Sequence, residues 1–395
     1  MLKQKLPRAS ANSGRTPVRR RAKKLLKIGI SCYAHFGGSG VVASELGREL
    51  ARRGHEVHLI ASHLPFRLRS FEPNIYFHES TPAIYPVFEE APSNLALATK
   101  MVEVTENYML DVLHVHYAMP FATSAYLAKQ IMLPRELGVV TTLHGTDITV
   151  VGAEPSLFRV TQFSMQSSDR LTAVSRFLKE RAEATFGFTK PIEVIYNFVD
   201  PQVFAPPRRD HRMRLGGPGT KVLMHASNFR AVKNIPVVIQ VFAEVRKQLQ
   251  AKLVMVGDGP EKAGAEQLAR ELGVHRDVLF LGNQDCMEEM LPMADVFLLP
   301  SSSESFGLVA LEAMSAEVPV VCSNAGGLPE VVEHGFTGFL HDPAHVAGYT
   351  ASALKLLTND TLRRTMGRRG RRVAMERFSA EEMIERYVQV YESLR

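Results

Sequence analysis

Short apolar runs rich in β-branched residues alternate with helical runs along most of this sequence, and this alternation constrains the fold more than any other feature. In the first half the apolar runs are KIGISC, EVHLIAS, IYFHES, VLHVH, VVTTLH, LTAVS and IEVIYN. Several are continuous, as expected for strands that are buried on both faces. Strands of this kind, joined by crossover helices, form a parallel, doubly wound α/β sheet.

A single interruption divides the alternation into two halves. Residues 201–220, PQVFAPPRRDHRMRLGGPGT, are rich in Pro, Gly and Arg, and we interpret them as a linker. Beyond them KVLMHAS, KLVMVGDGP, VLFLG, DVFLLPS and VPVVCS repeat the pattern. The sequence therefore predicts two Rossmann-like domains, 25–200 and 221–375, and a helix over 376–395 that could pack back on the first domain. Ligands of such sheets bind beyond the carboxyl ends of the strands, so we expect the site in the cleft between the domains.

Composition excludes several classes of protein. With 45% hydrophobic and 22% charged residues, the chain has the make-up of an ordinary globular protein. No stretch approaches the ~20 apolar residues that a membrane helix needs. Cys32, Cys286 and Cys322 are scattered and form no CxxC pair. This pattern argues against a disulfide framework and a structural zinc site, and it favours a reducing cytoplasm.

The basic character of the chain lies at its start. Residues 1–24 hold nine of the 47 Lys and Arg residues and none of the 41 Asp and Glu residues, so the remainder is slightly acidic. We interpret 1–24 as a disordered, solvated tail, with a loose contact to an anionic surface or nucleic acid as the alternative. No apolar segment of a signal peptide follows it, and the remainder gives no indication of nucleic-acid binding.

A glycine-rich loop follows the first predicted strand. In HFGGSGVVASELG, Gly38, Gly40 and Ala43 match the GxGxxA fingerprint of dinucleotide-binding proteins, so a nicotinamide-dependent oxidoreductase has to be considered. That fingerprint needs an acid at the end of the second strand, and here the strand ends LIASHLP without one. The loop is equally consistent with a tight strand-to-helix turn, or with a close approach of ligand to backbone.

Two more loops with polar groups follow strands of the first half. In TTLHGTDIT, His144 stands at a strand end, and in HVHYAMP, His116 and Tyr117 lie just past a strand. A histidine is more often packed or hydrogen-bonded within the protein than catalytic, so both interpretations of His144 stay open.

The second half carries a candidate anion site. In HASNFRAVKN, Arg230 and Lys233 are three residues apart at the opening of a helix, where free backbone N–H groups would add to their charge. A solvated surface pair is the alternative. In VGDGP the turn 257–260 also follows a strand, and it could pack against a phosphate or a planar group. A purely structural turn would need no ligand.

The stretch ESFGLVALEAM places Glu304 before a helix and Glu312 inside its apolar run. Ser301 and Glu304 have the spacing of a helix capping box, which would explain Glu304 alone. A buried carboxylate such as Glu312 needs hydrogen-bond donors, and the hydroxyl groups of a ribose would supply them. The helix is predicted to start near Phe306, which leaves the amides of Gly307 and Leu308 free for phosphate oxygens.

These loops together resemble the motifs of the retaining GT-B glycosyltransferases of family 4. ESFGLVALEAM is similar to the E-x7-E motif of that family, and GGSG, HGTD, SNFRAVKN and VGDGP resemble its other loops. The resemblance covers 27–395. It implies a GT-B fold, in which two Rossmann-like domains face each other across a cleft, with the acceptor bound by the first domain and the nucleotide-sugar by the second.

The resemblance also implies roles for individual residues. The donor-binding set would be Gly37, Gly38, Asn228, Gly257, Phe306, Gly307, Leu308 and Glu312. Catalytic roles would fall to His144, which contacts the donor sugar, to Arg230 and Lys233, which neutralise the diphosphate, and to Glu304, which holds a sugar hydroxyl. Acceptor contacts would come from Ser39, Lys100, Tyr117 and Thr142.

The substrates implied are UDP-GlcNAc and L-malate, joined with retention in the first step of bacillithiol synthesis. No DxD triplet occurs in the sequence, which agrees with donor binding without a metal, and no cofactor is expected. Alternatives are a related transferase with another sugar donor or a glycan or lipid acceptor, the oxidoreductase mentioned above, and a binding protein without turnover. We expect a cytoplasmic protein without stable membrane insertion and without a nucleic-acid partner, and a homo-oligomer stays open.

Overall fold

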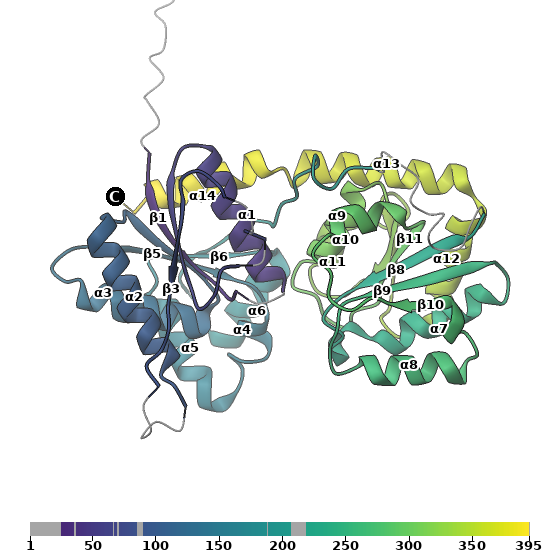
Figure 1. Ribbon diagram of the computed structural model, residues 1–395, viewed down its shortest axis with the longest axis horizontal. Helices are drawn as coiled ribbons and strands as arrows, with labels where there is room; N and C mark the ends of the chain where they lie inside the picture. The colour runs from purple at the N-terminus through teal and green to yellow at the C-terminus, as the bar shows by residue number, and fades with distance from the viewer. Residues whose placement is uncertain are drawn as a thin grey trace, which may run out of the picture.

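A computed structural model of the chain describes residues 25–34, 37–65, 67–68, 71–84, 90–187, 189–206 and 219–394. The tail predicted for 1–24 lies outside the described residues, and so does most of the predicted linker, 207–218. Within the described ranges the chain forms two α/β domains that stand side by side (Figure 1).

The N-terminal domain contains a parallel sheet of seven strands within the described residues, in the order β3-β2-β1-β4-β5-β6-β7. Its strands are β1 (Lys27–Ser31), β2 (Glu56–Ala61), β3 (Ile75–Glu79), β4 (Val112–His116), β5 (Gly138–Leu143), β6 (Arg170–Ala173) and β7 (Ile192–Val194). The helical segments are α1 (Gly38–Arg52), α2 (Ser93–Tyr108), η1 (Ala118–Ala122), α3 (Thr123–Ile131), α4 (Thr146–Thr149), α5 (Pro155–Ser167) and α6 (Arg176–Phe186). The strands β1, β2, β4 and β5 are almost entirely buried, as sheets covered on both faces require, whereas β3 and β7 at the two edges are more exposed.

The C-terminal domain contains a second parallel sheet, with six strands among the described residues in the order β10-β9-β8-β11-β12-β13. These strands are β8 (Lys221–Ala226), β9 (Ala251–Val256), β10 (Val278–Phe280), β11 (Val296–Leu299), β12 (Val320–Ser323) and β13 (Gly338–His341). The helical segments are η3 (Ala231–Lys233), α7 (Ile235–Arg246), α8 (Lys262–Glu271), η4 (His275–Asp277), α9 (Met287–Met290), η5 (Leu291–Met293), α10 (Leu308–Ser315), α11 (Leu328–Val331), α12 (Val346–Thr358), α13 (Asp360–Arg377) and α14 (Ala380–Glu392). The prediction of two Rossmann-like domains is confirmed.

Apolar side chains cover both faces of each sheet. In the N-terminal domain one core lies under α1 and α14 and the other under α2 and α3. In the C-terminal domain α7, α8 and α12 cover one face. The core on the other face continues into the N-terminal domain, because Phe306 and Phe378 belong to the same cluster as Leu143 and Leu178. One continuous cluster of buried apolar side chains therefore connects the two domains next to the carboxyl ends of their sheets.

The C-terminal helices join the two domains. Helix α13 runs along the C-terminal domain, and α14 continues across to the N-terminal domain, where it lies beside α1 (Figure 1). Tyr387 and Tyr391 of α14 are buried in the N-terminal core, and the Tyr391 hydroxyl lies 2.7 Å from Nδ1 of His114. Val199 and Ser379 pair in an isolated bridge where the chain crosses between domains in both directions.

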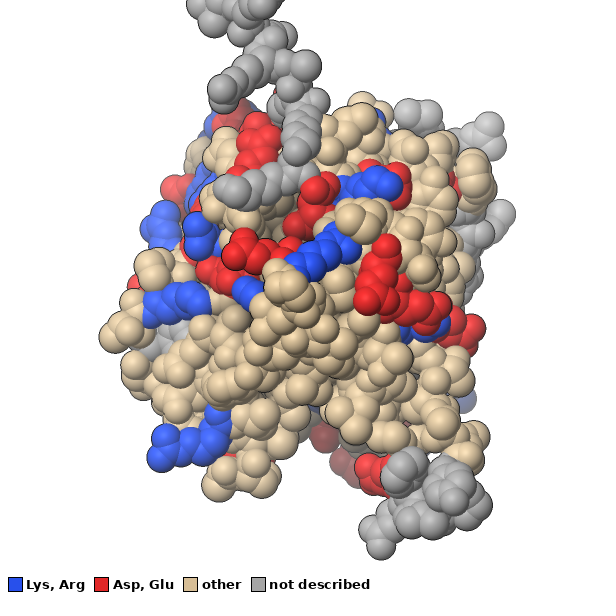
Figure 2. Space-filling view, turned by 90° about the vertical axis from the view of Figure 1, so that its left-hand side faces the viewer, with Lys and Arg blue, Asp and Glu red and all other residues tan. Residues whose placement is uncertain are grey.

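On the face formed by the N-terminal domain, basic and acidic side chains are interspersed, so neither sign of charge dominates that surface (Figure 2). Cys32, Cys286 and Cys322 are all free thiols, as their scattered positions predicted. Among the described residues, none of the helices combines the length and the apolar character that crossing a membrane requires.

Candidate active site

The loop after β5 and the loop after β11 touch across the two domains. A side chain at Gly145 would overlap the hydroxyl of Ser305, and the Gly145 φ of 125° is one that glycine adopts without strain. The hydroxyl of Ser175, at the start of α6, donates a hydrogen bond of 2.6 Å to the carbonyl of Ser305. The predicted histidine loop and the predicted glutamate loop therefore belong to one site.

Asp147 holds the loop that carries His144. Its carboxylate accepts hydrogen bonds from the amides of Gly145 at 2.7 Å, His144 at 3.2 Å and Ala118 at 2.9 Å. Burial raises the pKa of Asp147 to about 6, although these backbone donors act in the opposite direction. His144 is 8% exposed, and burial lowers its pKa to about 3, so its ring is neutral at physiological pH.

Tyr117 and Ser39 lie next to this loop. The centroids of the Tyr117 and His144 rings are 5.2 Å apart. The Tyr117 hydroxyl interacts with the side chains of Ser39 and Thr146. Tyr117 also adopts a φ of 88°, a strained value for a residue with a Cβ and one that is found most often at functional sites. Two of the predicted acceptor contacts thus lie together, beside the predicted catalytic histidine.

The other two predicted acceptor residues lie elsewhere. Thr142 is fully buried in β5, and its hydroxyl is shared between His114 at 2.7 Å and Thr172 at 2.6 Å, so its position does not support a contact with a substrate. Lys100, on α2, binds Glu103 at 2.6 Å, and in the described part of the chain no interaction joins it to Ser39 or Tyr117. The i,i+3 spacing of Lys100 and Glu103 is consistent with their ion pair, whereas nothing in the sequence indicated the partners of Thr142.

Gly37 and Gly38 open helix α1. A Cβ added at either residue would meet no protein atom within 4 Å, so packing within the protein does not require glycine there. The helix has no side-chain hydrogen bond at its N-terminus, which leaves backbone N–H groups available. This geometry allows a ligand to approach the backbone, as the prediction requires.

Lys233 and Glu304 are joined by an ion pair. Lys233 Nζ lies 2.6 Å from Glu304 Oε2, and both side chains are less than one-fifth exposed. Arg230, at the start of η3, is exposed, and no ion pair involves it among the described residues. Two of the three predicted charged catalytic groups are therefore in contact, and the third is open to solvent.

The turns after β8 and β9 pack closely on each other. A side chain at Gly257 would overlap the carbonyl of Ser227, and one at Gly259 would overlap the carbonyl of Asn228. Gly257 has a φ of 117°, which also favours glycine. Packing within the protein therefore accounts for both glycines, and Asn228 is exposed.

Helix α10 begins at Leu308, two residues later than predicted, and Gly307 precedes it with a φ of 96°. The Phe306 side chain packs against Tyr196 and Phe378, so only its backbone could face a ligand. No side chain caps the helix. The capping-box interpretation of Ser301 and Glu304 is therefore wrong, because the helix starts too late for either residue to cap it.

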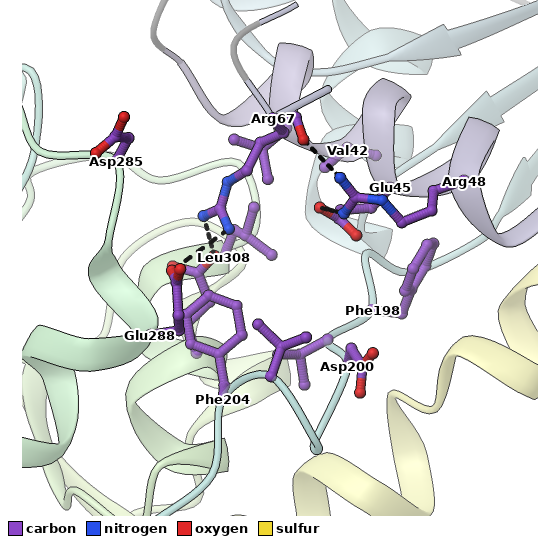
Figure 3. A pocket seen from close by; sticks show the side chains of 14 residues that line it. Val42, Glu45, Arg48, Arg67, Phe198, Asp200, Phe204, Asp285, Glu288 and Leu308 are labelled. Atoms are coloured by element: carbon purple, nitrogen blue, oxygen red, sulfur yellow. Dashed lines mark hydrogen bonds and ion pairs between the residues drawn. The ribbon is translucent and has the colours of Figure 1, made fainter. Parts of the chain in front are cut away.

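Glu312 is buried on α10 and faces an arginine of the other domain. Arg67 Nη2 lies 3.6 Å from Glu312 Oε1. Arg67 Nη1 lies 3.8 Å from Glu288 Oε2, and Figure 3 shows these two side chains pointing toward each other. Burial raises the pKa of Glu312 to about 7, with Arg67 acting in the opposite direction. The sequence indicated the buried acid but gave no signal for Arg67, which lies in an irregular segment outside any motif.

A cavity of about 360 Å³ opens beside this pair, between α1 of one domain and α9 and α10 of the other. Its lining carries acids from both domains, among them Glu45, Glu288 and Glu312, and the cations Arg48 and Arg67 (Figure 3). Arg48 holds the Arg67 segment through a hydrogen bond of 2.5 Å to the Arg67 carbonyl. In the described part of the chain, no group of three or more His, Cys, Asp or Glu side chains is placed to hold a metal ion.

Two parallel Rossmann-like sheets meet at this site, which carries glycine turns, the cations Arg230 and Lys233, and the glutamates Glu304 and Glu312. This is the architecture of a two-domain GT-B enzyme. The family models agree: Glycosyltransferase Family 4 matches 36–203, and Glycosyl transferases group 1 matches 208–373. The chain belongs to the family 4 glycosyltransferases. The alternative of a nicotinamide-dependent oxidoreductase is thereby excluded.

Relatives and structural neighbours give the same result. The chain is 48% identical over 370 residues to N-acetyl-alpha-D-glucosaminyl L-malate synthase of Bacillus anthracis, which covers 93% of this chain and 96% of that protein. It is 29% identical to a GDP-mannose-dependent phosphatidylinositol monomannoside mannosyltransferase of Mycolicibacterium smegmatis, over 71% of this chain and 76% of that protein. Anabaena Alr3699/HepE in complex with UDP-glucose shares the GT-B architecture, with a TM-score of 0.79, 21% identity, and coverage of 93% of this chain and all of that one.

Proposed function

We propose that this enzyme transfers N-acetylglucosamine from UDP-GlcNAc to the hydroxyl group of L-malate, with retention at the anomeric carbon and without a metal. The observation that carries the proposal is the 48% identity, over nearly the whole of both chains, to a protein named for that product. In this account the reaction is the first step of bacillithiol synthesis and takes place in the cytoplasm.

The donor would lie across the carboxyl end of the second sheet. Arg230 and Lys233 supply positive charge for the diphosphate, and the uncapped N-terminus of α10 adds backbone N–H groups at Gly307 and Leu308. Glu304 is then released from Lys233 to accept from a sugar hydroxyl, and Glu312 accepts from the ribose. Each group has a partner of opposite polarity on the ligand, which supports this orientation.

In the proposed reaction, the bond between the anomeric carbon and the diphosphate oxygen breaks, and a bond from that carbon to the malate hydroxyl oxygen forms on the same face. The hydroxyl proton passes to the departing phosphate oxygen, and UDP leaves. Lys233 and Arg230 stabilise the negative charge that develops on the diphosphate, a function that a metal ion performs in other enzymes. Positioning by the closed cleft supplies much of the remaining rate.

The acceptor would lie beside His144, Tyr117 and Ser39, and the interaction of the Tyr117 hydroxyl with the Ser39 side chain supports this placement by bringing two polar groups together there. The malate carboxylates would be bound there by hydroxyl and amide donors. Lys100 stays a proposal for one carboxylate, which requires that it leave Glu103.

Release of UDP from UDP-GlcNAc, followed in the presence of L-malate, D-malate, glycerate, lactate and myo-inositol, tests the proposal. We expect turnover that depends on L-malate, and mass spectrometry of the product should give the mass of N-acetylglucosaminyl malate. Turnover only with another acceptor, or only with GDP-mannose or UDP-glucose as donor, would instead identify a different transferase of the family. That alternative is favoured by relatives such as the mycobacterial mannosyltransferase, which uses another donor.

A further inference from the structure

His116 and His144 are in direct contact beneath the proposed reaction centre. His116 ends β4, and His144 follows β5, the neighbouring strand. Nδ1 of His116 lies 2.8 Å from Nε2 of His144. The two rings are stacked, with centroids 5.1 Å apart and an interplanar angle of 29°. His116 is completely buried, and the contact with His144 is the hydrogen bond that orients its ring.

Both rings are neutral at physiological pH. Burial lowers the pKa of His144 to about 3 and holds the pKa of His116 well below its ordinary value, with His114 and His144 adding to the effect on His116. A neutral imidazole carries one N–H and one lone pair. A nitrogen-to-nitrogen hydrogen bond of 2.8 Å therefore has two arrangements, in which the proton between the rings belongs either to His116 or to His144.

The other nitrogen of His116 decides between them. Nε2 of His116 is buried and has no hydrogen-bond partner among the residues that the structure describes. If His144 donated, the proton of His116 would sit on this Nε2 and would form a buried N–H without an acceptor. If His116 donates from Nδ1, only a lone pair is left without a partner, which proteins tolerate better than an orphaned N–H.

We propose that His116 is a positioning residue that donates from Nδ1 to His144 and thereby holds the His144 proton on Nδ1. His144 then presents an uncharged N–H donor at the carboxyl end of β5, where an oxygen of the donor sugar would accept it. Nδ1 of His144 has no hydrogen-bond partner in the described part of the chain, whereas its backbone amide is held by Asp147. The role toward the sugar rests on the proposed function, but the proton assignment does not.

A proton assignment can be measured without turnover. The full chain, labelled with ¹⁵N-histidine, is studied at pH 7.5 by long-range ¹H–¹⁵N correlation, and the His116 and His144 signals are identified by their loss in the His116→Asn and His144→Asn variants. We expect both rings in the Nδ1–H form. A His144 ring with its proton on Nε2 overturns the proposal, whatever the activity of the enzyme.

Kinetics test the consequence. In His116→Leu the donor to His144 is lost, and we expect kcat to fall by roughly 10-fold to 100-fold, while KM for UDP-GlcNAc changes little. In His116→Asn the side-chain amide can donate in place of Nδ1, and kcat should recover most of the loss. His58→Leu is the matched control, because His58 is also a buried histidine of the same sheet, paired with Glu56 and His78.

The two variants separate positioning from packing. A loss in His116→Leu that His116→Asn does not recover, with unchanged thermal stability in both, would contradict the positioning role. If the wild-type enzyme showed no turnover with UDP-GlcNAc and L-malate, the proposed function would fail, and the labelled spectra would still decide where the His144 proton lies.

Discussion

Lys233 Nζ lies 2.6 Å from Glu304 Oε2, and this ion pair joins the loop after β8 to the loop after β11. Each side chain has a proposed partner on the donor, the diphosphate for Lys233 and a sugar hydroxyl for Glu304. Without a ligand the two side chains satisfy each other, and each is less than one-fifth exposed. In the proposed complex, donor binding would therefore exchange one charge-assisted contact for two.

Replacing Lys233 by Met should remove charge stabilisation of the departing diphosphate. We expect kcat/KM for UDP-GlcNAc to fall by about 10² to 10³, as for the loss of one preorganised donor in other enzymes. Initial rates of UDP release measure the effect. Lys247→Met is the control, since Lys247 forms a comparable ion pair, with Glu244, on the exposed surface of α7. Equal rates in the two variants would show that Lys233 has no part in leaving-group stabilisation.

Glu312→Gln tests the ribose contact. Because burial raises the pKa of Glu312 to about 7, the carboxyl is protonated at lower pH and loses part of its capacity to accept from a ribose. The wild-type affinity for UDP should rise between pH 6 and pH 8, whereas the variant should bind more weakly with a flat profile. Isothermal titration calorimetry measures both, with Glu271→Gln on the exposed face of α8 as the control. A pH profile that survives in Glu312→Gln would assign the titration to another group.

The same variant has a predicted effect on stability. The folded state holds the Glu312 proton more tightly than the unfolded chain, whose carboxyl titrates near 4.5. The wild type therefore loses this contribution to stability as pH rises from about 4.5 to about 7, while the stability of Glu312→Gln has no such dependence because its amide does not titrate. The difference in Tm between variant and wild type should grow in favour of the variant from pH 5 to pH 8, and a constant difference would argue against a raised pKa.

Arg67→Met should shift the pH profile of UDP binding. The wild-type pKa of Glu312 reflects burial, which raises it, and the charge of Arg67, which lowers it. Without the arginine, the midpoint of the UDP-binding profile should move to higher pH, and binding at pH 7 should weaken. Calorimetry over the same pH series decides the point. An unchanged midpoint would mean that the 3.6 Å contact between the two side chains does not persist in solution.

Glu330 joins the domains in a way that the sequence did not indicate. Its carboxylate, on α11, accepts from the amides of Arg176 at 3.0 Å and Phe177 at 2.9 Å at the start of α6, and from the Tyr196 hydroxyl at 3.0 Å. Glu330→Ala should lower the free energy of unfolding by about 1–2 kcal/mol, in the range for loss of a helix cap. Thermal denaturation, with the exposed Glu333→Ala as control, measures this effect. Equal Tm values would show that the α6 N-terminus is satisfied by other groups.

The fold was predictable because parallel sheets covered on both faces require continuous apolar strands, and the central strands of both sheets, such as β1, β4, β8 and β11, follow that rule. Residues at strand ends, such as His144 and Glu304, were also within reach, since topology alone brings the carboxyl ends of parallel strands to one edge. The helix starts were less well predicted. Helix α10 begins at Leu308, because Gly307 adopts a left-handed conformation that a spacing rule does not anticipate.

Contacts between the domains could not be predicted from the sequence. Arg67 meets Glu312, and Glu330 meets α6, through the relative placement of two separately folded units, which leaves no periodic pattern in either segment. The same holds for Thr142. The resemblance implied an acceptor contact for it, but its hydroxyl is bound by His114 and Thr172 inside the sheet.

The anomeric configuration and linkage of the product test the central claim most directly. The enzyme is incubated with UDP-GlcNAc and L-malate, and the product is studied by ¹H NMR and mass spectrometry. We predict N-acetylglucosamine linked through its anomeric carbon to the malate hydroxyl, with the small anomeric coupling constant of the α configuration. A β-linked product would contradict retention, and the lack of any malate-containing product while another acceptor is consumed would contradict the proposed function.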